Sequence, residues 1–179
     1  MTAVSRSSAA DQAAKVAKFV GALPPNSVDF QSVDASTGDL ATVFKGADAV
    51  VSCVGVVPGG KAQLAGNGAV NVRIADAAAS AKVPKMVYVS VASAISDGPG
   101  KFIFGDYMKG KAQAEAAVKK DFGDYMIIKP AVISGGPPGP PGPPGVPPVP
   151  VEAVAKAAVA GALGKASGVF DGADAIIKL

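Results

Sequence analysis

VNVRIADAAASAKVPKMVYVSVA, residues 70–92, is the stretch that decides the fold, because a helix pattern runs directly into a buried-strand pattern. In its first half, apolar residues recur at the spacing of one helical face: Val70, Ile74, Ala77 and Ala81. Pro84 ends this helix, and residues 86–91 form a nearly uninterrupted apolar run. Such a run is typical of a strand in a sheet that helices cover on both faces. The stretch therefore predicts part of a βαβ unit.

The rest of the chain repeats this alternation of short β-branched runs and Ala-rich segments, which is typical of a parallel α/β sheet. Ser8 and Asp11 have the spacing of a capping pair at the start of the first helix. We expect strands at residues 2–5, 28–33, 49–54, 86–91 and 125–133, with one or two more in 168–179. We expect helices at residues 8–20, 40–44, 68–82, 107–120 and 151–163.

Residues 135–150 differ in composition from the rest, since they hold nine of the fifteen prolines. Residues 136–145 read (Gly-Pro-Pro)₃-Gly, but three triplets are too few for a collagen triple helix. We interpret residues 135–150 as a stiff polyproline-II linker, and we expect residues 137–150 to be extended, exposed and free of ladder hydrogen bonds. The predicted organisation is a nucleotide-binding core over 1–134, the linker over 135–150, and a helix with a strand over 151–179 that returns to the core.

Composition excludes several classes of protein. The chain has no histidine and a single cysteine, which argues against a metal site, a Ser-His-Asp hydrolase and an internal disulfide. Its net charge of +3 comes from scattered lysines without interleaved aromatics, so we predict no nucleic-acid partner. No run approaches the roughly 18 apolar residues of a membrane span, and no targeting segment is visible.

Five blocks follow one another in a characteristic order: TAVSRS (2–7), FKGADAVVSCVG (44–55), NVRIADAAASAKVPKMVYVSVAS (71–93), YMKGKAQAEAAV (107–118) and YMIIKPAVISGG (125–136). Together they resemble the extended and atypical short-chain dehydrogenase/reductase superfamily, and within it the complex-I accessory-subunit-like and plastid-associated members. The resemblance implies a doubly wound parallel sheet of the Rossmann type.

The resemblance assigns candidate catalytic residues. Tyr107 and Lys111 form the superfamily's YxxxK pair, in which lysine holds the nicotinamide ribose and lowers the pKa of the tyrosine. At i and i+4, both side chains emerge on one face of a helix. The family's third residue is a serine or threonine, where our alignment places Ala92; Ser93 could replace it after a one-residue shift, and Ser90 lies on the other side.

The resemblance also assigns candidate cofactor-binding residues. Arg6 stands where NADP-binding relatives have a basic residue, so NADP is the expected cofactor, held also by Lys111. Asp34 corresponds to the acid that contacts adenine, or caps the following turn. Gly55 resembles the glycine that lets the cofactor approach the backbone. Asn71 is either the family's structural asparagine or an ordinary polar helix residue, and Lys129-Pro130 stands where many relatives have Arg-Pro.

One part of the family pattern has no counterpart in residues 1–179. The sequence begins on the family's second strand, without the central first strand and its G-x-G-x-x-G turn. We therefore expect an N-terminally truncated domain in which the strands at 2–5 and 49–54 are not neighbours in one ladder. Without the Gly-rich turn, we also expect NADP binding to be weakened or lost. A Pro/Gly segment stands where relatives insert much of their substrate lobe, so a reduced lobe is expected as well.

Two classes of function remain open from the sequence. The favoured one is a non-catalytic or weakly active accessory subunit of a larger assembly, with protein partners and an organellar location implied by the resemblance. The alternative is an NADP-dependent oxidoreductase of unknown substrate that uses Tyr107 and Lys111.

Overall fold

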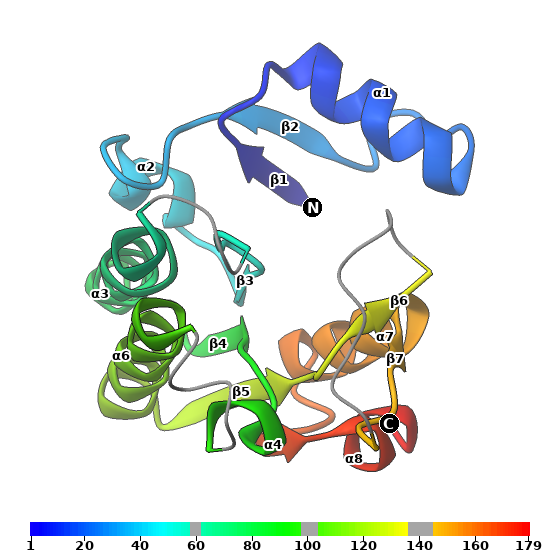
Figure 1. Cartoon of the computed structure of the whole chain (residues 1–179). Helices are drawn as coiled ribbons and strands as arrows, with labels where there is room; N and C mark the ends of the chain where they lie inside the picture. The colour runs from blue at the N-terminus through cyan, green and yellow to red at the C-terminus, as the bar shows by residue number, and fades with distance from the viewer. Residues whose placement is uncertain (58–61, 98–103, 136–144) are drawn as a thin grey trace.

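The computed structural model describes residues 1–57, 62–97, 104–135 and 145–179. Parallel strands alternate with helices along the chain (Figure 1). The strands are β1 (Thr2–Ser5), β2 (Asp29–Ser32), β3 (Val50–Ser52), β4 (Lys85–Val89), β5 (Asp124–Lys129), β6 (Ile133–Ser134), β7 (Val149–Pro150) and β8 (Gly168–Asp171). The helices are α1 (Ala9–Val20), α2 (Leu40–Phe44), the π-helix η1 (Ala65–Ala69), α3 (Val70–Ser80), α4 (Ser93–Ser96), α6 (Gly105–Asp121), α7 (Val151–Ala162) and α8 (Ala173–Ile177).

The central sheet has four parallel strands in the order β3-β4-β5-β8. Helices α3 and α6 lie on one side of it, and α7 and α8 on the other (Figure 1). Alternate residues of β4 point to the two sides: Met86 and Tyr88 join the first core cluster, and Val87 and Val89 join the second. This arrangement confirms the doubly wound, Rossmann-type fold expected from the sequence.

The first two strands form a separate two-stranded parallel sheet, β1-β2, against which α1 packs. In the described parts of the chain no strand pairing joins β1 to β3, and this confirms the expectation that they are not neighbours in one ladder. A link to the main body runs through α3, where the guanidinium of Arg73 donates to the carbonyls of Ala35 at 2.7 Å and Gly38 at 2.6 Å.

The predicted first helix is correct in its bounds and its cap. Ser8 Oγ accepts a hydrogen bond from the Asp11 amide at 3.1 Å and donates to the Asp11 carboxylate at 2.8 Å. The third helix differs from its prediction at its start. An α-helix was expected from residue 68, whereas the π-helix η1 covers Ala65–Ala69 and the α-helix α3 begins at Val70. Its buried face also includes Asn71, Ala75 and Ala78, which the apolar pattern did not pick out.

The expectation that the linker makes no ladder hydrogen bonds is wrong at its carboxyl end. Residues 149 and 150 form β7, which pairs with β6, and the Val149 amide donates to the Val132 carbonyl at 2.8 Å. The Val149 side chain is fully buried among residues of α7, α8 and the central sheet. The apolar side chain therefore fixes this end of the segment, while residues 136–144 lie outside the described residues.

The chain ends in a helix rather than in a second terminal strand. After β8, Gly172 has a φ of +82°, which glycine adopts without strain, and α8 begins at the next residue. Ala173 and Ile176 are three residues apart and both buried, so they occupy one helical face, which packs against α7. A strand would have sent these two side chains to opposite faces.

Candidate functional site

The candidate site lies at the carboxyl ends of the central strands, where α6 presents Tyr107 and Lys111. The Lys111 ammonium lies 5.8 Å from the centre of the Tyr107 ring and 5.1 Å from that of Tyr88. It donates a hydrogen bond of 3.0 Å to the carbonyl of Val89, the last residue of β4. Lys111 is only 7% exposed. The structure thus places the two residues of the YxxxK pair together against the end of β4.

Close packing between α6 and η1 allows this placement. A Cβ on Gly110 would lie 2.9 Å from both the Asn67 Cβ and the Gly68 amide nitrogen, so only glycine fits there. A Cβ on Gly55, which follows β3, would lie 2.8 Å from Asn67 Oδ1 and 3.5 Å from Lys111 Nζ. The glycine between Tyr107 and Lys111 therefore brings α6 close enough for the lysine to reach the strand ends.

Burial sets the protonation behaviour of the pair. Loss of solvation lowers the pKa of Lys111 to about 8, against smaller raising effects from Cys53 and Glu115. Burial also raises the pKa of Tyr107, because the phenol loses solvation and its charged form is disfavoured.

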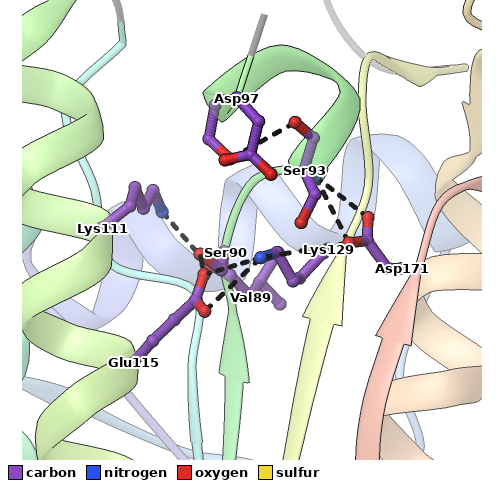
Figure 2. A network of polar contacts seen from close by, with 9 residues as sticks. Val89, Ser90, Ser93, Asp97, Lys111, Glu115, Lys129 and Asp171 are labelled. Carbon is purple, nitrogen blue, oxygen red and sulfur yellow. Dashed lines mark hydrogen bonds and ion pairs between the residues drawn. The ribbon is translucent and has the colours of Figure 1, made fainter. Parts of the chain in front are cut away.

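The serine position differs from the family pattern in its surroundings. Ala92, where our alignment places the family's serine, is 1% exposed, and its amide donates to the Pro130 carbonyl at 2.9 Å. The Ser90 hydroxyl donates to Glu115 at 2.5 Å (Figure 2). Ser93 begins α4, and its amide donates to the Asp171 carboxylate at 3.0 Å. Among the described residues no hydrogen bond joins either serine to Tyr107.

Arg6 and Asp34, which the family resemblance assigns to the adenosine half of the cofactor, follow two neighbouring strands. Arg6 comes directly after β1 and is exposed, and Asp34 comes two residues after the end of β2. Asp34 Oδ1 accepts hydrogen bonds from Ser36, at 2.8 Å from the amide and 2.6 Å from the hydroxyl. These bonds lower the pKa of Asp34, with a further contribution from the charge of Arg6. Asp34 therefore caps a turn in this structure.

Two buried asparagines organise the site, and only Asn71 was singled out from the sequence. Asn71 is fully buried, accepts a 2.6 Å hydrogen bond from the Ser52 hydroxyl and donates to the Val54 carbonyl at 3.0 Å, as a structural asparagine would. Asn67 was missed, although it is fully buried and bonds both the amide and the carbonyl of Val56. Its signal was its position four residues before Asn71, one helical turn away.

Other kinds of site find little support in the described residues. A cavity of about 540 Å³ lies beside η1 and the start of α6, lined by residues of 62–69 with Asp106 and Gln113, and includes neither Tyr107 nor Lys111. No group of three metal-ligating side chains gathers in residues 1–57, 62–97, 104–135 and 145–179. None of the helices described there is long and apolar enough to span a bilayer.

The comparisons with known proteins identify the class. A family model described as NAD(P)H-binding matches residues 2–166. No curated protein matches the chain. Among solved structures, a UDP-N-acetylglucosamine 4-epimerase from Methanobrevibacter ruminantium, in complex with UDP-N-acetylmuramic acid, is 17% identical with a TM-score of 0.66, over 86% of this chain and 64% of its own.

Two further solved structures are similar. The enzyme WbmH from Bordetella bronchiseptica, in complex with NAD⁺, is 19% identical with a TM-score of 0.61, over 84% of this chain and 61% of its own. The oxidoreductase ylbE from Lactococcus lactis is 22% identical with a TM-score of 0.56, over 75% of this chain and 59% of its own. This chain therefore spans about 60% of the length of the solved structures that it resembles.

These findings define a protein with a Rossmann-type fold of the NAD(P)H-binding class. The chain belongs to the NAD(P)H-binding family, whose model covers nearly all of it.

Proposed function

We propose that the protein is an NAD(P)-dependent oxidoreductase in which Tyr107 exchanges a proton with the substrate and Lys111 holds the nicotinamide ribose. One observation carries this proposal: a lysine that is 7% exposed lies against the Tyr107 ring at the carboxyl ends of the central strands. Burying a lysine without a carboxylate in direct contact costs free energy, and such groups are concentrated at functional sites. In open parallel sheets, ligands bind at this edge.

The residues present fit the nicotinamide-ribose part of a dinucleotide. The bound cofactor would supply or accept the hydride. Gly55 has no side chain where the chain leaves β3, and Lys111 Nζ lies just beyond the position that its Cβ would take. The Lys111 ammonium has two further N–H donors beyond the one that it gives to Val89, and these are available to ribose hydroxyls. The Tyr107 phenol is protonated at neutral pH, because its pKa is raised, and so acts as the proton donor in reduction.

NADP rather than NAD is the cofactor that we propose. Arg6 is exposed at the carboxyl end of β1 and its side chain makes no ion pair with the described residues. A guanidinium binds phosphate oxygens through two parallel hydrogen bonds, which suits the 2′-phosphate that distinguishes NADP from NAD.

A second candidate function is a non-catalytic accessory subunit that keeps the fold within a larger assembly. It is supported by the surroundings of the serine position, where Ala92 is buried and carries no hydroxyl. The Ser90 hydroxyl is already donated to Glu115, so it does not polarise a substrate carbonyl. An organellar location and protein partners belong to this candidate and rest on the family resemblance.

Tyr107→Phe separates the two candidates. We expect NADPH affinity to stay nearly unchanged, since the phenol acts on the substrate, and NADPH-dependent turnover of small aldehydes and ketones to fall about 10²–10⁴-fold. Tyr125→Phe, a half-buried tyrosine of β5, is the matched control and should keep full turnover. Unchanged turnover in Tyr107→Phe would contradict the proposed mechanism. Absence of turnover across such a panel in the wild-type protein, with NADPH bound, would favour the accessory subunit.

A further inference from the structure

Beyond the YxxxK pair, the segment 89–93, which begins at the last residue of β4, is held from three sides (Figure 2). Lys111 of α6 donates to its first carbonyl, at Val89. Glu115, one helical turn further along α6, accepts the Ser90 hydroxyl at 2.5 Å. Asp171, the last residue of β8, accepts the Ser93 amide at 3.0 and 3.4 Å. Two of these three contacts are therefore made by carboxylates from opposite sides of the segment.

A single cation connects the two carboxylates. Lys129, the last residue of β5, has its ammonium 3.5 Å from both carboxylate oxygens of Glu115 and 4.0 Å from Asp171 (Figure 2). The side chains of Lys129 and Glu115 are only 12% and 15% exposed, whereas Asp171 is 37% exposed. The charges alternate along the strand ends in the order Lys111, Glu115, Lys129 and Asp171.

We propose that Lys129 is a positioning residue of the candidate site: it holds Glu115 and Asp171 where they fix the segment 89–93, and so sets Ser93 relative to Tyr107 and Lys111. The functional meaning of this placement rests on the proposed function, since Ser93 is the serine of the segment whose hydroxyl is not donated to Glu115. The placement itself is a property of the protein without cofactor or substrate.

The geometry favours positioning over a simple stabilising ion pair. Solvent-exposed ion pairs contribute little to folding, and Lys129 and Asp171 approach only to 4.0 Å at a half-exposed carboxylate. The local consequence is larger, because without the cation Glu115 is a poorly solvated charge and Asp171 is free to turn towards water. The Ser93 amide would then lose a charged acceptor, and hydrogen bonds to charged groups are stronger than average.

The test measures amide hydrogen exchange by NMR in the protein without ligand. In Lys129→Met, whose side chain has similar length but no charge, we expect the Ser93 amide to exchange about tenfold faster or more. The Ala92 amide donates to the backbone carbonyl of Pro130 and should be unaffected, so it serves as the internal control. Lys156→Met, on an exposed lysine of α7, is the matched control substitution.

Lys129→Arg keeps the charge and should restore slow exchange at Ser93, which a purely steric role would not explain. Asp171→Asn should accelerate the Ser93 amide alone, and combining it with Lys129→Met should add nothing further at this amide. If Lys129→Met does not fold, Lys129→Gln takes its place with the same expectation.

Unchanged Ser93 exchange in a folded, uncharged variant would overturn the proposal, even if the melting temperature fell. Because this readout needs no turnover, its failure and the failure of the proposed oxidoreductase activity are separate results. Where turnover is measurable, Lys129→Met should lower kcat more than it raises the KM for NADPH, and Lys129→Arg should restore kcat.

Discussion

The four-stranded sheet and the N-terminal unit, which consists of β1, α1 and β2, are both parallel β-structures with a helix packed on them, yet they differ in burial. The core clusters are built around β3, β4 and β5, and residues of β4 and β5 are fully buried. In residues 1–32 the only buried side chain is that of Gln12, which donates to the carbonyls of Ser7 at 3.0 Å and Gln31 at 2.8 Å.

The difference lies in what covers each sheet. Helices pack on both faces of the four-stranded sheet, whereas the N-terminal unit has one helix and an open edge at β1. The facing edge of the main sheet, β3, is open as well among the described residues, and Val51 in it is 42% exposed. Apolar burial is the main stabilising contribution to folding, so the two regions should respond very differently to the same change.

A matched pair of side-chain truncations, one in each region, should give the largest expected difference in stability. Ile127→Ala, at a fully buried position of β5, should lower the free energy of unfolding by about 2–5 kcal/mol, because it removes buried methyl and methylene groups and leaves a cavity. Phe30→Ala in the partly exposed β2 should cost clearly less, although its side chain is larger. Chemical denaturation of both variants gives the comparison. Equal losses would contradict the view that the two regions differ in packing.

Adding a methyl group at the contact of α6 with η1 should have the next largest effect. Gly110→Ala places a Cβ 2.9 Å from the Asn67 Cβ and the Gly68 amide, so we expect a loss of about 1–3 kcal/mol and a displacement of Lys111. Gly123→Ala, where a Cβ would have no neighbour within 4 Å, should change stability little. A Gly110→Ala variant as stable as the wild type would show that α6 can move without cost.

The same contrast explains what the sequence could predict. The strand β4 and the helices α6 and α7 were predicted correctly, because buried periodic elements leave a strong apolar signal. The strand expected over 125–133 ends at Lys129, and Ile133–Ser134 form the separate strand β6. The roles of Glu115 and Asp171 could not be predicted, because each depends on partners more than ten residues away in the chain. Val149 was misassigned because prolines around it suggested an exposed linker, whereas one apolar side chain in the core was sufficient to fix that end.

The smallest expected effect concerns Tyr88 in the best-packed strand. Its hydroxyl is buried and has no hydrogen-bond partner among the described residues. Removing a buried hydroxyl without a partner is neutral or favourable, so Tyr88→Phe should raise the free energy of unfolding by up to about 1 kcal/mol. Thermal unfolding measures this gain. A clear loss of stability would show that the hydroxyl of Tyr88 has a hydrogen-bond partner in the folded protein.

The proposed cofactor site spans the two regions, with Arg6 and Asp34 after β1 and β2, and Gly55 and Lys111 at the edge of the main sheet. The most direct test is hydrogen exchange of the full chain with and without NADPH. We predict that the amides of β1 and β2 exchange faster than those of β4 and β5 without ligand, and that NADPH slows exchange in both regions. Lys111→Ala should weaken this protection. Exchange in β1 and β2 that does not change at saturating NADPH would contradict the account.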